Sequence, residues 1–276
     1  MKKIDIEEMR SLVLAIADRI IASKPLLTEV DSKIGDGDHG IGMETVFLAV
    51  QRALDGTSFS TINQLFCQTG MAMLNSMGGA SGIIFSSIFL GGIKGMSDVT
   101  EITCADFADM MKRSLEAIQK RGNAKLGDKT MVDAFAPACA AMTGYAGEDF
   151  AELFARAAEA AYQGVENTKM YVAKFGRAKS LMDRAIGFQD AGATSVWIIW
   201  QAEWRSWWKP APDRRRSWPC SCRNAIITVI RKYRSLSRPW PLSGPCIRRN
   251  MKRRGRTICS GPASTARRPR DIPRFW

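Results

Sequence analysis

Apolar residues recur at helical spacing along the first two hundred residues of the chain, and this pattern limits the folds open to it. Near the start, Met9, Leu12, Val13, Ile16 and Ile20 lie three or four positions apart, which puts their side chains on one face of an α-helix. Similar segments follow at 43–54, 60–76, 80–94, 104–120, 129–143, 149–164 and 190–203. No segment alternates clearly between apolar and polar residues, as a half-buried strand does. We therefore expect an all-α bundle with its functional loops at helix ends.

The charge and composition of the chain change abruptly near residue 204. Residues 205–276 contain 20 basic and 2 acidic residues, whereas residues 1–204 contain 20 basic and 25 acidic ones. All eight Trp lie at or beyond Trp197, and nine of the eleven Pro lie at or beyond Pro210. Such a shift marks a domain boundary. We expect a helical domain over 1–204 and a basic tail rich in Arg, Trp and Pro over 205–276.

The composition of the tail has two interpretations. Its enrichment in Arg, Trp, Pro, Ser and Cys is typical of translation in a shifted reading frame, and its Pro and charge content predicts disorder. Alternatively, Arg pairs interleaved with Trp could contact the phosphates and bases of a nucleic acid. No nucleic-acid fold signature accompanies them, so we expect no nucleic-acid partner. Resequencing the gene tests the first interpretation, because one uninterrupted frame with uniform codon usage would exclude a frameshift.

The segment 71–93 is long enough to span a membrane as a helix. These 23 residues carry no formal charge, and Gly78 and Gly82 form a G-x-x-x-G pattern. Because Asn75 and several glycines and serines dilute the apolarity of the segment, we expect a buried helix and no membrane partner. The start of the chain has no apolar signal region, and the three cysteines of the helical domain form no C-x-x-C motif. These features favour a cytoplasmic protein.

The stretch IGDGDHGIGM, residues 34–43, combines a phosphate-loop pattern with carboxylates. Its glycines fit G-x-G-x-x-G, but nothing strand-like precedes them, and Asp36 and Asp38 would repel a bare pyrophosphate. A bound Mg²⁺ would remove this repulsion, because the ion takes hard oxygen ligands and bridges carboxylates to phosphates. With Asp31 five residues before Asp36, the loop predicts a Mg²⁺ site, and a simple Asp–Gly turn is the alternative. A calcium EF-hand does not fit, since Ile41 would take the position of its glycine.

Two further loops have features of phosphate sites. GGASG, residues 78–82, precedes an apolar helix whose N-terminus could face a phosphate together with Ser81, and close helix packing is the alternative. GRAKS and DAGATS follow near the end of the domain. Arg177 could bind two phosphate oxygens at once, whereas Asp190 could either contact a ligand or cap a helix.

The stretch GDKTMVD, residues 127–133, has a superficial likeness to a P-loop, but the tripeptide Gly-Lys-Thr is absent from the chain. Lys129 could simply pair with Asp128 or Asp133. His39 is the one histidine of the chain. We interpret it as a hydrogen-bonding neighbour of the acidic loop, with general-base and phosphohistidine roles as alternatives.

Taken in order, DSKIGDGDHGIGM, GGASG, GDKTM and GRA…IG–QDAGA resemble the nucleotide-binding L subunit of dihydroxyacetone (glycerone) kinases over about residues 5–200. The resemblance implies an eight-helix antiparallel barrel with a nucleotide at one end. In the bacterial multi-subunit form, ADP stays bound as a cofactor and is rephosphorylated by a phosphohistidine (M-type) protein of the phosphotransferase system. The resulting ATP donates its γ-phosphoryl group to dihydroxyacetone on a separate K subunit.

The resemblance also implies the ligands and partners of this chain. It implies two Mg²⁺ ions bound by Asp31, Asp36 and Asp38. It implies nucleotide contacts from His39, Gly40, Ala80, Ser81, Gly122, Met131, Arg177, Asp190 and Gly192. It assigns no catalytic residue to this chain, because the substrate-binding histidine of the family is on K. A homodimer, ATP as the direct donor, another ketose such as erythrulose, and a non-catalytic regulatory role all stay open.

Overall fold

The computed structural model of the chain describes residues 2–76 and 79–207. These residues belong to the first of two compact units, Met1–Asp213, and the second unit is Arg214–Trp276. Nearly all of the expected basic tail therefore lies outside the described residues. Its disorder, its shifted reading frame and the boundary near residue 204 stay predictions.

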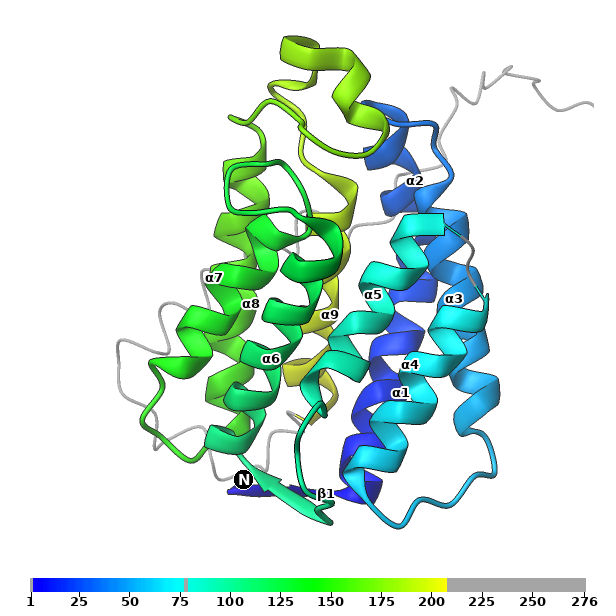
Figure 1. Ribbon diagram of the computed structural model, residues 1–276, viewed down its shortest axis with the longest axis vertical. Coiled ribbons are helices and arrows are strands. Elements are labelled where there is room, and N and C mark those ends of the chain that lie inside the picture. Colours follow the sequence, from blue (N-terminus) through cyan, green and yellow to red (C-terminus); the bar gives the residue numbers. More distant parts are fainter. Residues whose placement is uncertain (1, 77–78, 208–276) are drawn as a thin grey trace, which may run out of the picture. The chain divides into compact units, whose positions relative to one another are not determined.

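Helices account for most of the described residues (Figure 1). They are α1 (Ile6–Ala22), α2 (Lys24–Ser32), α3 (His39–Leu54), α4 (Ile62–Ser76), α5 (Gly79–Gly92), α6 (Cys104–Gly122), α7 (Val132–Thr143), α8 (Phe150–Thr168), the 3₁₀-helix η1 (Arg177–Ala185) and α9 (Ala191–Trp207). The first turn of α1 carries a capping box, in which Asp5 accepts from the N–H of Glu8 and Glu8 accepts from the N–H of Asp5.

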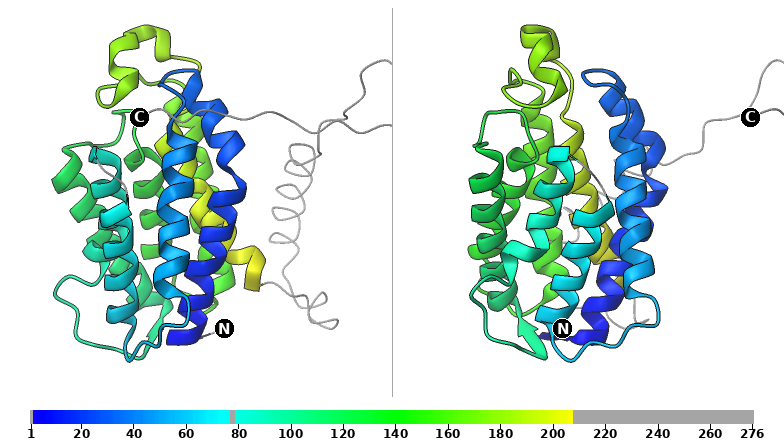
Figure 2. Two further views of the ribbon diagram at one scale, coloured as in Figure 1. Left: turned by 90° about the vertical axis from the view of Figure 1, so that its right-hand side faces the viewer. Right: turned by 45° about the vertical axis from the view of Figure 1, so that its right-hand side comes forward.

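Eight of these helices close into a ring. Each of α1, α3, α4, α5, α6, α7 and α8 packs against the next in that order, α8 packs against α9, and α9 packs against α1. Successive helices run in opposite directions, as Figures 1 and 2 show. The expected eight-helix antiparallel barrel is therefore confirmed. Short connections suffice to build it, because antiparallel neighbours begin where the preceding helix ends.

The described part of the chain contains two helices, α2 and η1, and two strands that the periodicity did not predict. Ser23 ends α1, and α2 starts at once with Pro25 in its first turn, where a missing N–H costs nothing. Strand β1 (Lys3–Asp5) pairs antiparallel with β2 (Glu101–Thr103), so that Ile4 lies opposite Ile102. Strands of three residues are too short to show a period of two. They join the start of α1 to the start of α6, two helices that are not neighbours in the ring.

Aromatic side chains fill the inside of the ring and tie its walls together. Trp200 of α9 is 1% exposed. Its ring packs edge-on against Phe107 of α6 with centroids 6.3 Å apart, and it also meets Phe135 of α7 at 5.7 Å. Phe107 in turn contacts Phe154 of α8. Burial of such large rings is the main source of stability for a barrel of amphipathic helices.

The segment 71–93 does not form one long helix. Residues 71–76 belong to the end of α4, and residues 79–92 form α5. Within the described residues, no helix combines the length and the apolarity that crossing a membrane requires.

The antiparallel ring brings four helix N-termini to the same end. Helices α3, α5, α7 and α9 all begin there, because alternate helices of the ring point in the same direction. The first N–H groups of each helix have no partner within the helix, and the helix dipole makes that end positive. This end of the barrel is therefore suited to bind anions.

Candidate nucleotide-binding site

An acidic cluster lies where α2 ends and the next loop leads into α3. Asp31 is on the last turn of α2, and Asp36 and Asp38 are on the loop. Each carboxylate offers an oxygen within 4.8 Å of an oxygen of the other two. The loop folds back this tightly because Gly37 adopts a φ of 77°, a conformation that favours glycine. The N–H of His39 donates to Asp31 Oδ2 over 3.2 Å, which fixes the start of α3 against the cluster.

The cluster concentrates negative charge. Desolvation and then the neighbouring carboxylates of Asp36 and Asp31 raise the pKa of Asp38, while Arg177 acts in the opposite direction. Arg177 Nη2 lies 2.9 Å from Asp36 Oδ2. Carboxylates that repel one another at this distance are stabilised by a cation. Three oxygen donors within reach of one another fit the ligand preferences of Mg²⁺.

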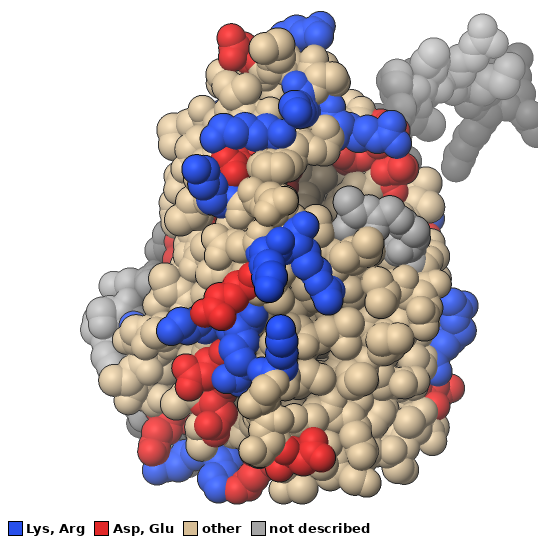
Figure 3. Space-filling model, viewed as in Figure 1, with Lys and Arg blue, Asp and Glu red and all other residues tan. Residues whose placement is uncertain are grey.

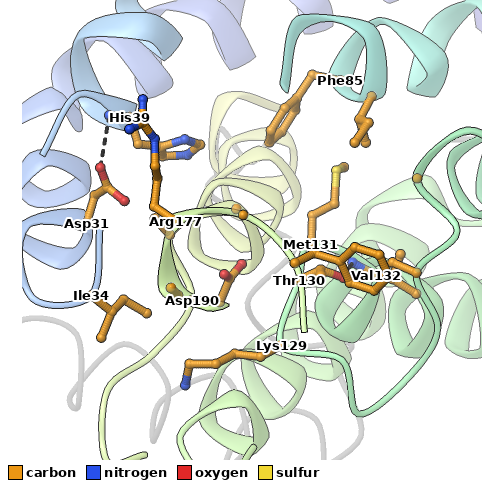
Figure 4. A pocket seen from close by; sticks show the side chains of 18 of the residues that line it. Asp31, Ile34, His39, Phe85, Lys129, Thr130, Met131, Val132, Arg177 and Asp190 are labelled. Atoms are coloured by element: carbon orange, nitrogen blue, oxygen red, sulfur yellow. Dashed lines mark hydrogen bonds between the residues drawn. The ribbon is translucent and has the colours of Figure 1, made fainter. Parts of the chain in front are cut away.

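The acidic cluster forms one wall of a cavity of about 650 Å³ at the end of the barrel where the four N-termini meet. Figure 3 shows the hollow in the upper part of this face, between basic and acidic side chains. The opposite wall is apolar. It is lined by Ile84, Phe85, Ile118, Met131 and Val132, and Figure 4 shows Phe85, Met131 and Val132 across the cavity from Asp31. A cavity of this size with one charged and one apolar wall suits a ligand that is itself charged at one end.

His39 lies between the two walls. A hydrogen bond of 2.8 Å joins its Nε2 to Ser195 Oγ of α9, and its ring centroid is 6.1 Å from that of Phe85. Burial lowers the pKa of His39, and the charge of Asp31 opposes this shift. A neutral imidazole that holds α3 against α9 agrees with our interpretation of His39 as a hydrogen-bonding neighbour.

Asp190 caps α9 inside the cavity. Its Oδ2 accepts from the N–H of Ala193 over 2.7 Å, and its own N–H donates to Thr168 Oγ1 over 3.0 Å. Burial raises its pKa to about 7, against the opposing effects of the Ala193 N–H and of Lys129. The helix-cap interpretation of Asp190 is thus confirmed. The same side chain lines the cavity, so it is also within reach of a ligand.

The GDKTMVD loop makes contacts that differ from those we expected. Lys129 does not pair with either aspartate of the motif, because its Nζ donates to the main-chain carbonyls of Thr168 and Phe188 over 2.6 and 2.5 Å. Asp128 instead pairs with Lys174, 2.6 Å away. The loop is fixed from within by Asp133, which accepts from the N–H groups of Gly127 and Thr130.

Most of the residues that we expected to bind metal or nucleotide line this cavity. They are Asp31, Asp36, Asp38, His39, Gly122, Met131, Arg177, Asp190 and Gly192. Gly40 is not among them. It is buried where α3 crosses α2, and a Cβ there would lie 2.5 Å from the carbonyl oxygen of Lys24. Ala80 and Ser81 belong to the first turn of α5, but the placement of their side chains lies outside what the structure describes.

Periodicity could not identify the apolar wall of the cavity. Ile84, Phe85 and Ile118 have the spacing of core residues, and only their position at the end of the ring exposes them to a ligand. Arg121 also lines the cavity, and its Nη1 donates to Ser87 Oγ over 2.9 Å. The one signal for Arg121 in the sequence is its position at the last turn of α6. That signal does not distinguish a ligand contact, because basic residues are common there for helix stability alone.

Comparison with known proteins identifies the family. The family model described as the DAK2 domain matches residues 33–204. The chain belongs to the DAK2 domain family. Among curated DAK2 relatives, the ADP-binding subunit DhaL of PEP-dependent dihydroxyacetone kinase 2 from Listeria innocua is 38% identical over 176 residues, which are 63% of this chain and 82% of the subunit. The corresponding subunit of Escherichia coli is 33% identical, over 63% of this chain and 84% of the subunit.

Longer proteins also match this part of the chain. The L-erythrulose kinase of Pectobacterium atrosepticum is 34% identical over 68% of this chain, but the match spans only 32% of that kinase. The crystal structure of the dihydroxyacetone kinase from C. freundii in complex with AMP-PNP and Mg²⁺ superimposes on 71% of this chain and 33% of that one, with a TM-score of 0.57 and 22% identity. At this level of identity the superposition supports the shared fold alone.

Proposed function

We propose that this chain is the nucleotide-binding subunit of a dihydroxyacetone kinase, which relays a phosphoryl group to a ketose on a separate K-type subunit. The lengths of the relatives support this assignment. The chain matches more than four fifths of two ADP-binding subunits but only about a third of the longer L-erythrulose kinase. This coverage supports the role of an ADP-binding subunit for the helical domain.

The shape of the cavity supports ADP or ATP as its ligand. The observation that carries the proposal is one cavity with carboxylates and Arg177 on one wall and aliphatic and aromatic side chains on the other. A nucleotide has the same division into charged phosphates and an apolar base. The helix N-termini around the cavity add N–H donors for the phosphate oxygens.

Mg²⁺ accounts for the acidic wall. The three carboxylates of Asp31, Asp36 and Asp38 fit the metal by donor type and by mutual distance, and we propose that they hold two ions. When bound, Mg²⁺ neutralises the phosphate oxygens and fixes their orientation. Without such an ion, the aspartates would repel the anion that the rest of the cavity attracts.

The residues of the chain itself position and neutralise the phosphoryl group, and none is proposed to form a covalent intermediate. Arg177 has a guanidinium at the cavity wall, where it can bind phosphate oxygens in place of Asp36. His39 and Asp190 hold the starts of α3 and α9 in position through their hydrogen bonds. Phosphoryl transfer depends mainly on such positioning and charge stabilisation.

The partners that follow from this role are a K-type subunit with the ketose and an M-type phosphohistidine protein that rephosphorylates bound ADP. We place the chain in the cytoplasm, where its three described cysteines, which are free thiols, are stable. A homodimer is compatible with this role. Dihydroxyacetone is the acceptor that we propose, and the similarity to an L-erythrulose kinase makes erythrulose the second candidate.

Reconstitution tests this role. The purified chain is combined with a bacterial K-type subunit, an M-type subunit and phosphoenolpyruvate, and formation of dihydroxyacetone phosphate is measured. We expect transfer that is abolished in the Asp36→Ala variant and retained in Asp183→Asn, which changes an exposed carboxylate away from the cavity. Replacing dihydroxyacetone with erythrulose identifies the acceptor, and replacing phosphoenolpyruvate with ATP identifies the donor. Nucleotide binding without transfer to either ketose would refute the kinase role and support a regulatory one.

A further inference from the structure

A cap covers the cavity between the end of α8 and the start of α9. We use "cap" for residues 169–189, which include η1 and carry Arg177; Figure 1 shows the segment above the barrel. The two ends of the cap meet at a neck, where the N–H of Gly187 donates to the carbonyl of Lys169 over 2.7 Å. The cap touches the acidic loop through a small apolar cluster of Ala173 and Ala185 with Ile34. Its position therefore determines where Arg177 lies.

Lys129 fastens the neck of the cap. The two carbonyls that accept from its Nζ belong to Thr168 and Phe188, one on each side of the neck. Lys129 is 1% exposed, and Figure 4 shows its side chain beneath Asp190. Its backbone has a φ of 58°, which is costly for a residue other than glycine and persists only where the surroundings hold it.

Asp128 fastens the cap at a second point. Its Oδ1 accepts from Lys174 Nζ over 2.6 Å, and its main-chain carbonyl accepts from the N–H of Lys174 over 3.2 Å. Its other carboxylate oxygen accepts from the N–H of Lys125 over 2.8 Å, which ties the contact to the loop before α7. Asp128 is 2% exposed. A buried carboxylate with these partners is fixed in one orientation.

We propose that Asp128 and Lys129 are positioning residues, together a latch, that hold the cap over the cavity and thereby set how long a magnesium nucleotide stays bound. The proposal rests on the nucleotide role assigned to the cavity. It explains why a charged side chain is buried at position 129: only a multiple donor on a long stem can satisfy two carbonyls from different segments. Burial lowers the pKa of Lys129, and the carboxylates of Asp190 and Asp133 favour its charged form.

The first test measures the cap in the nucleotide-free protein. We compare Lys129→Met and Asp128→Asn with Lys125→Met, a control that removes an exposed charge from the same loop. Hydrogen exchange is followed at the amides of Lys174, Gly187 and Asp190. Both latch variants should speed this exchange by about tenfold or more while amides of the barrel keep their protection, since loosening is confined to the cap. Exchange equal to that of the control would overturn the proposal.

The second test measures the consequence for the ligand. Complexes with Mg²⁺ and a fluorescent ADP analogue are chased with excess ADP. The latch variants should release the analogue about tenfold faster, with association changed less than about threefold, because loss of fixed contacts acts mainly on dissociation. Unchanged dissociation in both variants would contradict the proposal. If the parent chain binds no magnesium nucleotide, the proposed function fails, and hydrogen exchange still decides whether the latch exists.

A double-mutant cycle distinguishes positioning from general destabilisation. If the latch acts by positioning Arg177, Lys129→Met should speed release of the analogue only slightly once Arg177→Met is present, so that the two effects are not additive. Fully additive effects would show that Lys129 acts independently of Arg177 and would overturn the proposal. Should Lys129→Met fail to fold, the same cycle is made with Asp128→Asn, which keeps the size of the side chain.

Discussion

At the residue scale, the proposed Mg²⁺ site depends on the acidic cluster. Asp31, Asp36 and Asp38 lie on two elements, yet their oxygens come within 4.8 Å of one another. The raised pKa of Asp38 reflects desolvation and the neighbouring charges of Asp36 and Asp31. Since a metal ligand must be deprotonated, a raised pKa means that protons compete with Mg²⁺ at higher pH than they would at an ordinary aspartate.

Asp36→Ala tests the cluster directly. Removal of one carboxylate should weaken magnesium-dependent ADP binding by on the order of 100-fold, the upper end of what even indirect metal partners contribute. Isothermal titration with ADP at fixed Mg²⁺ measures this change, with Asp183→Asn as the control. Unaltered affinity of the Asp36→Ala variant would rule out a metal role for the cluster.

Asp190 makes the stability of the ligand-free protein depend on pH. Its pKa of about 7 lies above the ordinary 3.8, so the folded protein holds this proton more tightly than the unfolded chain does. The contribution to the free energy of unfolding is therefore complete below pH 3.8 and is lost as pH rises through 7. Asp190→Asn, which can still accept from Ala193, should remove this dependence.

Urea denaturation of the parent and of Asp190→Asn between pH 5 and pH 8 measures the effect. The parent should lose roughly 2 kcal/mol more than the variant over this range, a value reduced from the full shift because Asp190 is partly exposed. Parallel pH profiles of the two proteins would show that Asp190 is already ionised at pH 5.

At the element scale, the short helix α2 positions Asp31, and its contact with α3 is unusually close. A Cβ on Gly40 would lie 2.5 Å from the carbonyl oxygen of Lys24 and 2.8 Å from the nitrogen of Thr28. Both atoms belong to the backbone of α2 and cannot move aside alone. Gly40 thus allows the close contact between α2 and α3 that keeps Asp31 near the acidic loop, and it does not line the cavity.

Gly40→Ala should therefore push α2 away from α3. We expect a loss of about 1–3 kcal/mol in the free energy of unfolding, typical of overpacking, together with weaker magnesium-dependent ADP binding. Gly144→Ala is the matched control, because its nearest atom would be 3.5 Å away and its φ is −81°; it should change stability by less than about 0.5 kcal/mol. Equal effects of the two substitutions would refute the packing role of Gly40.

The periodicity of the sequence was sufficient to predict the long helices but not the elements between them. Helices such as α8 bury an apolar face and expose a polar one, so apolar residues recur along the sequence at helical spacing. The nine-residue α2 buries only Leu27 and Val30, too few to show a period. The three-residue strands β1 and β2 depend on pairing between segments about one hundred residues apart, which no local pattern contains.

At the scale of the whole described unit, closure of the helix ring brings four separate motifs to one end. The residues and their motif resemblance together were enough to predict that the acidic loop, Arg177 and Asp190 lie together, and all of them line one cavity. They did not predict the apolar wall, because Phe85 and Ile118 differ from core residues only in their height along the barrel. The contacts of Lys129 could not be predicted from the sequence either, because its partners are main-chain carbonyls, which every residue has.

Native mass spectrometry of the chain with Mg²⁺ and ADP tests most directly whether the cavity is a magnesium-nucleotide site. We expect the mass of the full chain to increase by one ADP and two Mg²⁺, and we expect Asp36→Ala to stay bare under the same conditions. The same experiment on a chain cut after residue 204 shows whether the tail affects binding. A parent chain that stays bare at millimolar Mg²⁺ and ADP would contradict the assignment of the cavity.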